Sequence, residues 1–147
     1  MKNNRLRSSF IKLLCAALLA VAASGCTAKK NAGAETAATA AAQTCLTVID
    51  NSEYGQSWQN ASALFRNAIT EDKWKTALET VRKPLGDVVS RTFKSAQAMT
   101  KLPGAPDGQY VVMQFETSFA NKKPATETVT FMLEKDGQWR AAGYFIN

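Results

Sequence analysis

Apolar and polar residues alternate along the last third of the chain. In QYVVMQFETSF, the odd positions Val111, Met113 and Phe115 are apolar, and polar residues occupy the even positions from 114 onward. TETVTFMLE repeats the pattern, with Val129 and Phe131 set between threonines. A period of two residues is typical of a strand that has one face on a hydrophobic core. The pattern therefore predicts a strand in each segment.

Two further segments, VVSRTFKSAQA and QWRAAGYFI, are also predicted strands. In the second of these, the residues expected on one face are Trp139, Ala141, Gly143 and Phe145. Asp136 and Gly137 precede this segment and predict a two-residue hairpin turn with positive φ at both positions. The expected sheet is therefore antiparallel and four-stranded.

A helical period precedes the strands. Thr70 is a candidate cap for a helix whose first turn contains Glu71 and Asp72. Its apolar stripe consists of Trp74, Leu78, Val81 and Leu85. The less regular segment SWQNASALFRNAI favours two or three short helices in this half of the domain. The sequence thus predicts an α+β fold, with short N-terminal helices packed on one face of a curved four-stranded antiparallel sheet.

The N-terminus has the pattern of an export signal. MKNNRLRSSFIK is basic and lacks acids, and the apolar run that follows is shorter than the roughly 20 residues of a membrane span. The run ends at Ala23-Ser24-Gly25-Cys26, which resembles the lipobox of bacterial lipoproteins, although that pattern prefers leucine at the position of Ala23. We expect residues 1–25 to be a signal peptide and Cys26 to be acylated. Ordinary cleavage after Ala22 or Ala23 is the alternative.

The residue after Cys26 is Thr27 rather than aspartate, which resembles lipoproteins sent to the outer membrane. We expect the chain to lie in the bacterial cell envelope, at the periplasmic face of that membrane. Residues 26–44 are rich in alanine and threonine and have no large apolar side chain, so they are expected to form a tether. Residues 45–147 are expected to form one domain.

Composition narrows the possible functions. Four of the 18 basic residues and none of the 12 acidic residues precede Cys26, which leaves a net charge of +2 from Cys26 onward. A basic footprint for nucleic acid is therefore absent. The chain has no histidine, which excludes Ser-His-Asp triads and His-ligated zinc.

Cys45 is left without an intramolecular disulfide partner and is expected to be a small buried apolar residue. We expect no metal and no cofactor.

Four segments carry a family resemblance: DNSEYGQSW, KWKTALETVRKPLGDVVSR, LPGAPDGQYVVMQFETSF and ETVTFMLEKDGQWRAAGYF. In this order they resemble the bacterial envelope family catalogued as domain of unknown function 4019. The resemblance implies a cone-shaped α+β fold similar to nuclear transport factor 2-like or cystatin-like domains. It implies no activity, because the family has none assigned.

Two charged residues are candidates for a pocket or ligand site. Arg91 is in phase with Phe93, and Glu127 is in phase with Val129, so both side chains are expected to point toward the core and to meet near the mouth of the cone. Solvated strand ends are the alternative. The aromatic ring of Trp58 makes it a third candidate for this pocket.

Other residues suggest a surface or a loop with a role in binding. The candidate interface residues Tyr110, Val112, Tyr144 and Ile146 are expected on the outer sheet face, where a partner protein, a covering segment or a second copy would shield them. The loop LPGAPDG is interpreted as a stiff connection, with the rim of a ligand site as the alternative.

These features favour a non-enzymatic envelope lipoprotein that binds another envelope component. The alternative is a small-molecule enzyme of isomerase or hydratase type, which would use carboxylate and tyrosine groups inside the cone.

Overall fold

The computed structural model describes the backbone of residues 11–147 and the side chains from residue 29 onward. The chain divides into two units, Met1–Gly33 and Ala34–Asn147, and helix α1 (Ile11–Asp50) contributes to both. The side chains of the predicted signal peptide and of Cys26 lie outside the described residues. Among the described residues, no helix combines the length and apolar character needed to cross a membrane.

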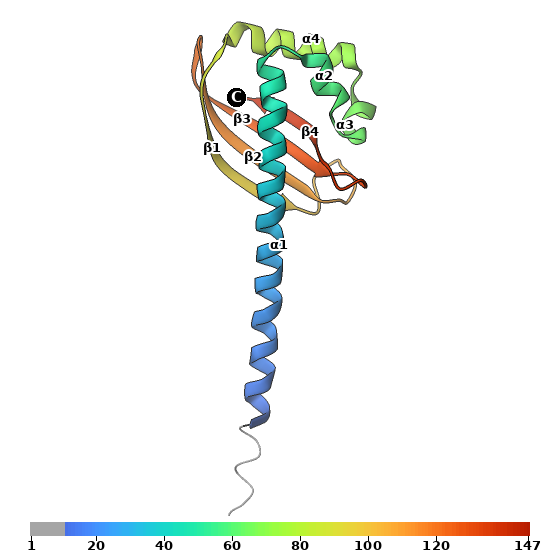
Figure 1. Ribbon diagram of the computed structural model, residues 1–147, viewed down its shortest axis with the longest axis vertical. Helices are drawn as coiled ribbons and strands as arrows, with labels where there is room; N and C mark the ends of the chain where they lie inside the picture. Colours follow the sequence, from blue (N-terminus) through green and yellow to red (C-terminus); the bar gives the residue numbers. More distant parts are fainter. Residues whose placement is uncertain (1–10) are drawn as a thin grey trace, which may run out of the picture. The chain divides into compact units, whose positions relative to one another are not determined.

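The second unit contains a four-stranded antiparallel sheet with the order β1-β2-β3-β4, and helices cover one of its faces (Figure 1). The strands are β1 (Val88–Met99), β2 (Tyr110–Phe119), β3 (Lys122–Leu133) and β4 (Trp139–Ile146). Each strand coincides with one of the four predicted segments to within one residue at each end, except that β3 begins four residues before its segment. The α+β fold class and the four-stranded antiparallel sheet are therefore confirmed.

Residues 34–50 of α1 pack along the covered face of the sheet. Ala38, Ala42 and Leu46 are fully buried at successive intervals of four residues. Their partners on β2 and β3 are Val111, Met113, Phe115, Val129 and Phe131. The prediction of a tether up to Thr44 is therefore wrong from Ala34 onward. The small alanine side chains let the helix lie close to the sheet. Both the alanines and the helix backbone next to them are therefore buried.

Three short helices complete the covered face: α2 (Tyr54–Gln59), α3 (Ala63–Ala68) and α4 (Glu71–Arg82). The Thr70 side chain caps α4 by accepting a hydrogen bond from the Lys73 N–H. Trp74 and Leu78 of α4 pack against Ile49 near the end of α1. The predicted cap and the group of short helices are confirmed.

A β-bulge interrupts β4. Ala141 pairs with Phe131, but the next pair along the ladder is Gly143 with Thr130, so Ala142 is an extra residue. One extra residue in a strand moves every later side chain to the opposite face of the sheet.

The bulge determines which residues at the end of β4 face the core. Tyr144 lies opposite Val129 on the core face, whereas Phe145 is 67% exposed. The predicted inward face is therefore right as far as Ala141 and wrong beyond it.

The hairpin between β3 and β4 is confirmed, but its turn differs from the prediction. Glu134 N–H bonds to the Gln138 carbonyl, and Gly137 N–H bonds to the Glu134 carbonyl. Gly137 has φ of 79°, and Asp136 is not in the positive-φ region. Three residues thus form the loop, with a single left-handed glycine, which is the common alternative to a two-residue turn.

Candidate functional site

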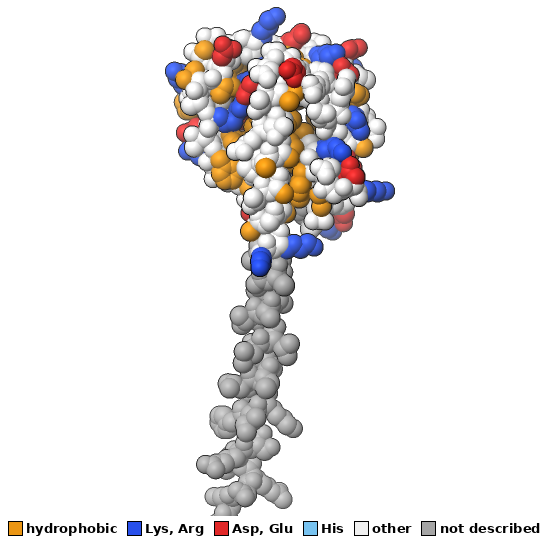
Figure 2. Space-filling view, in the orientation of Figure 1, with side chains coloured by type: hydrophobic (Ala, Val, Ile, Leu, Met, Phe, Trp, Pro, Cys, Tyr) orange, Lys and Arg blue, Asp and Glu red, His pale blue; other side chains and the backbone are white. Residues whose placement is uncertain are grey.

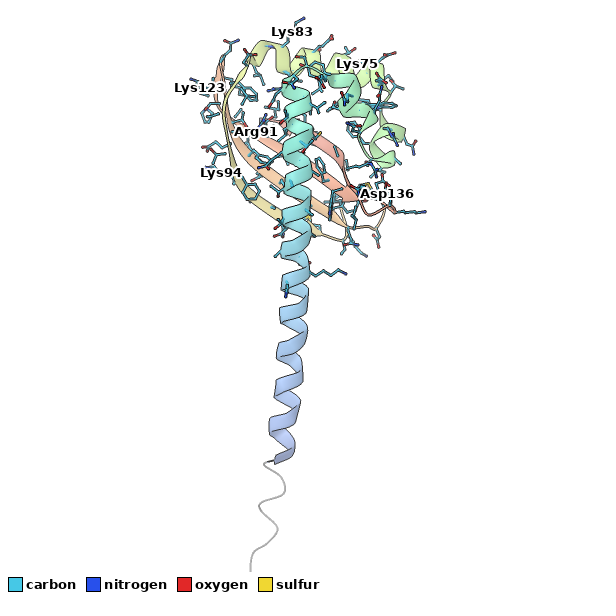
Figure 3. The ribbon with its side chains drawn as sticks, viewed as in Figure 1. Lys75, Lys83, Arg91, Lys94, Lys123 and Asp136 are labelled. Atoms are coloured by element: carbon cyan, nitrogen blue, oxygen red, sulfur yellow. The ribbon has the colours of Figure 1, made fainter. Side chains whose placement is uncertain are left out.

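Arg91 of β1 and Glu127 of β3 meet across β2, on the face of the sheet that the helices cover. Arg91 Nε lies 2.6 Å from Glu127 Oε2, and Arg91 Nη2 lies 3.2 Å from Oε1. The Glu127 side chain is 0% exposed and that of Arg91 is 16% exposed. Figure 3 shows Arg91 beside α1. The contact predicted from strand phase is confirmed.

Asp50, the last residue of α1, joins this pair to a second arginine. Its Oδ2 lies 2.7 Å from Arg91 Nη1, and its Oδ1 lies 2.6 Å from Nη2 of Arg82, the last residue of α4. The Arg82 guanidinium also lies over the Phe119 ring, 4.6 Å from its centroid. Sequence reasoning missed Asp50 and Arg82. Two arginines and two carboxylates therefore form one nearly buried network of zero formal charge.

Two hydroxyl groups complete the surroundings of Glu127. Tyr144 Oη donates a hydrogen bond to Glu127 Oε1 at 2.6 Å, and Thr117 Oγ1 donates one to Oε2. With Arg91, these hydroxyls give both carboxylate oxygens at least two donors. A carboxylate with this many donors is stabilised in its ionised form.

The protonation states follow from these contacts. Burial opposes ionisation of Glu127, but hydrogen bonds from Arg91, Thr117 and Tyr144 outweigh it and lower the pKa of the carboxyl. Burial raises the pKa of the Tyr144 phenol, and the nearby charge of Glu127 raises it further. Near neutral pH, Glu127 is therefore an anion and Tyr144 is neutral. The two pKa shifts therefore keep each group in its ordinary charge state at neutral pH.

The cavity next to Tyr144 is very small. A cavity of about 10 Å³ lies among Tyr144, Trp74, Val129 and their neighbours. This volume is at the lower limit for one water molecule. A substrate would therefore not fit in this cavity unless the surrounding side chains moved.

Open space lies beside α1, between α1, α2 and the β3–β4 hairpin, and it adjoins the small cavity at Cys45, Ser57 and Ala141. A cleft of about 230 Å³ adjoins a shallower hollow of about 630 Å³. Asn60, Trp139 and Arg140 line both of them, so the two spaces are continuous. In Figure 2, orange side chains lie to the right of α1, with blue and red side chains farther out. Neither Arg91 nor Glu127 lines either space.

Residues 41–144 match the family described as "Protein of unknown function (DUF4019)". The chain belongs to this family. The matched region contains the entire charged network, from Asp50 to Tyr144, and all the residues that line the cleft. No curated protein matches the chain.

The structure places the third predicted pocket residue of the DUF4019 domain elsewhere. Trp58 packs beside Trp74 in the cluster of short helices, and its indole N–H bonds to the Ile69 carbonyl at 2.8 Å. It is therefore separate from the contacts described for Arg91 and Glu127.

The four predicted interface residues do not form one outer surface. Tyr144 and Ile146 lie on the core face because of the bulge, with Ile146 opposite Glu127. Tyr110 is 1% exposed, and only Val112 is a partly exposed residue of the outer face. The prediction of a shared interface is therefore wrong for this set.

A segment of the domain itself covers Tyr110. The Tyr110 hydroxyl donates to the Pro106 carbonyl at 2.7 Å, and the ring lies against Gly108. The loop LPGAPDG therefore closes over an aromatic ring, as expected for a stiff structural connection.

Proposed function

We propose that this chain is an exported lipoprotein held at the membrane through acylated Cys26, and that its DUF4019 domain is a non-enzymatic binding module of the cell envelope. The binding role rests on one observation above all: neither of the buried charged residues Glu127 and Arg91 lines the open space. Arg91 pairs with both Glu127 and Asp50, whereas the cleft beside α1 is open and lined largely by apolar groups.

The anchor is supported by the export signal and by the Ser-Gly-Cys sequence at its end. Cys26 precedes Ala34, the first residue of the packed unit, by eight residues. Even a fully extended chain of that length spans only about 30 Å. We therefore propose that the domain stays close to the membrane, at the periplasmic face of the outer membrane.

An enzyme of isomerase or hydratase type remains the second candidate. It is favoured by the convergence of Glu127 and Tyr144 at 2.6 Å. The very small cavity next to Tyr144 and the lowered pKa of Glu127 support binding over catalysis.

The anchor is tested by intact mass and solution size of the protein, expressed with its own signal and extracted from the envelope. We expect a mature chain that begins at Cys26 and carries acyl groups, and we expect Cys26→Ala to be neither acylated nor processed at this site. An unmodified chain cleaved after Ala22 or Ala23 would overturn the anchor. The same sample shows whether the protein is a monomer, a homodimer or bound to an envelope protein.

A further inference from the structure

The cleft and the hollow beside α1 together have the form of a site for an amphiphile. We infer that they bind a molecule with a single apolar chain and an anionic headgroup, such as a membrane-derived lysolipid or fatty acid. The chain would occupy the cleft and the headgroup the hollow. This inference rests on the proposed binding function and specifies its ligand class.

The cleft offers apolar walls from three elements, α1, β3 and β4. Its volume is about 230 Å³, and its apolar lining comes from Ala41, Cys45, Val48, Phe131, Trp139 and Ala141. Burial raises the pKa of the Cys45 thiol to about 11, so this thiol is neutral at physiological pH. Apolar surface of this kind favours a hydrocarbon chain over a polar ligand.

The hollow contains an excess of positive charge. Its charged residues are Arg66, Lys135, Arg140, Glu134 and Asp136. Two of these are acids, and each already has a partner in the same region.

Glu134 accepts a hydrogen bond from the Ala63 N–H at 2.7 Å, at the start of α3. Asp136 accepts two bonds from Arg140, at 2.9 and 2.7 Å. Within the described residues, Arg66 and Lys135 form no ion pair. Arg66 also donates a hydrogen bond to the Gln59 carbonyl at 3.0 Å. The three basic and two acidic side chains leave a net charge of +1 in the hollow, which favours a bound anion.

The hollow lies at the end of the sheet where the chain enters the packed unit. One row of successive partners crosses the four strands at this end: Met99, Tyr110, Met132 and Arg140. The β1–β2 loop and the β3–β4 loop therefore both lie here. Glu35, at the beginning of the packed part of α1, bonds to the Ala98 N–H at the same end. Figure 3 shows Asp136 out on the β3–β4 hairpin. Under the proposed acylation of Cys26, the anchor would precede Glu35 by nine residues, and we expect this end to be the one nearest the membrane.

The test is calorimetric titration of the mature chain, from residue 26 with Cys26→Ser, with dodecyl phosphate below its micelle concentration. Dodecyl maltoside and inorganic phosphate serve as comparison ligands. We expect saturable binding of dodecyl phosphate at one site, weaker binding of dodecyl maltoside, and no measurable binding of phosphate. Equal affinity for the two dodecyl compounds would overturn the anionic headgroup, and binding of phosphate as tight as that of dodecyl phosphate would overturn the apolar chain.

Two pairs of variants locate the site. Ala41→Phe fills the cleft and is expected to weaken binding by at least about tenfold, whereas Ala40→Phe, at an exposed position of the same helix, leaves it unchanged. The double variant that combines Arg66→Gln and Lys135→Gln is expected to bind dodecyl phosphate about threefold to tenfold more weakly. Its binding of dodecyl maltoside is expected to be unchanged. Lys101→Gln, an exposed cation at the same end, is the charge control.

Thermal unfolding of each variant confirms that it is folded. Equal affinity in Ala41→Phe and Ala40→Phe would overturn the cleft as the binding site. The titration uses a chain without lipid, so its outcome is independent of acylation. Acylated Cys26 without binding would overturn only the ligand class, and binding without acylation would overturn only the anchor.

Discussion

At the scale of single residues, Glu127 shows how a buried charge is stabilised. Its side chain is fully enclosed, yet it faces a bidentate arginine and two hydroxyl donors. A buried carboxylate without such partners would be protonated or would destabilise the fold by several kcal/mol. The same contacts that make Glu127 tolerable in the core also make it a poor proton donor.

Glu127→Gln tests this account because it removes the charge and nearly preserves the shape. We expect the free energy of unfolding to fall by about 2–4 kcal/mol, since Arg91 loses a buried counter-charge. Urea unfolding at neutral pH measures the change.

The matched control is Glu116→Gln on β2. Glu116 is 53% exposed, and its ion pair with Lys94 at 3.3 Å lies in solvent. A surface pair of this kind contributes about 0–1 kcal/mol. Equal effects of the two substitutions would contradict a special role for the buried network.

At the scale of elements, the buried face of α1 is determined by the sheet against which the helix packs. Ala38 and Ala42 follow a helical stripe with Leu46 and Ile49, but alanine occurs all around this segment. The sequence therefore offers little contrast between a buried and an exposed face. The sheet beneath the helix decides which alanines are buried.

Ala42→Leu is expected to lower the free energy of unfolding by about 1–3 kcal/mol, because a larger side chain has no room between α1 and the sheet. Ala40→Leu, at an exposed position two residues away, is expected to change it by less than about 0.5 kcal/mol. Thermal unfolding measures both variants. If both left the melting temperature unchanged, residues 34–44 would behave as a tether after all.

At the scale of the whole molecule, the charged network joins five elements that are distant from one another in the sequence. Asp50 ends α1, Arg82 ends α4, and Arg91, Glu127 and Tyr144 come from three strands. Their ionisation is therefore coupled to global unfolding rather than to a local change, and stability should depend on pH.

The direction in which the free energy of unfolding changes with pH follows from the direction of each pKa shift. The pKa of Glu127 in the folded chain lies below its ordinary value of 4.5, so its stabilisation is present above pH 4.5 and is lost as the pH falls further. The pKa of Tyr144 lies above its ordinary value of 10.0, so its stabilisation is present below pH 10.0 and is lost as the pH rises beyond it. Cys45, raised from 9.0 to about 11, adds to the alkaline loss.

We therefore expect the free energy of unfolding to decline on both sides of a neutral plateau. Glu127→Gln should flatten the acid decline, and Tyr144→Phe should reduce the alkaline one. Tyr54→Phe, a half-exposed tyrosine in α2, is the control. Denaturant unfolding between pH 3 and pH 11 measures the profile, and an alkaline decline unchanged in Tyr144→Phe would contradict the assignment.

The sequence by itself determined the class of fold and part of the site. Local alternation and helix capping predicted four strands and α4, because these signals depend only on neighbouring residues. The phase of Arg91 and Glu127 also predicted their meeting, because Arg91 and Phe93 lie in the short regular stretch between the two register shifts of β1, and Glu127 and Val129 lie in a regular stretch of β3. The family resemblance was likewise readable from short motifs in order, and the match over residues 41–144 agrees with it.

Only the tertiary structure decided the remaining features. The bulge at Ala142 turned Tyr144 inward, and a single extra residue leaves no mark on the alternation of a strand as short as β4. Asp50 and Arg82 joined the network through contacts between the ends of two helices that are 32 residues apart in the chain. The cleft beside α1 depends on how a helix lies against a hairpin. Such packing is set by contacts between distant segments, which no local pattern contains.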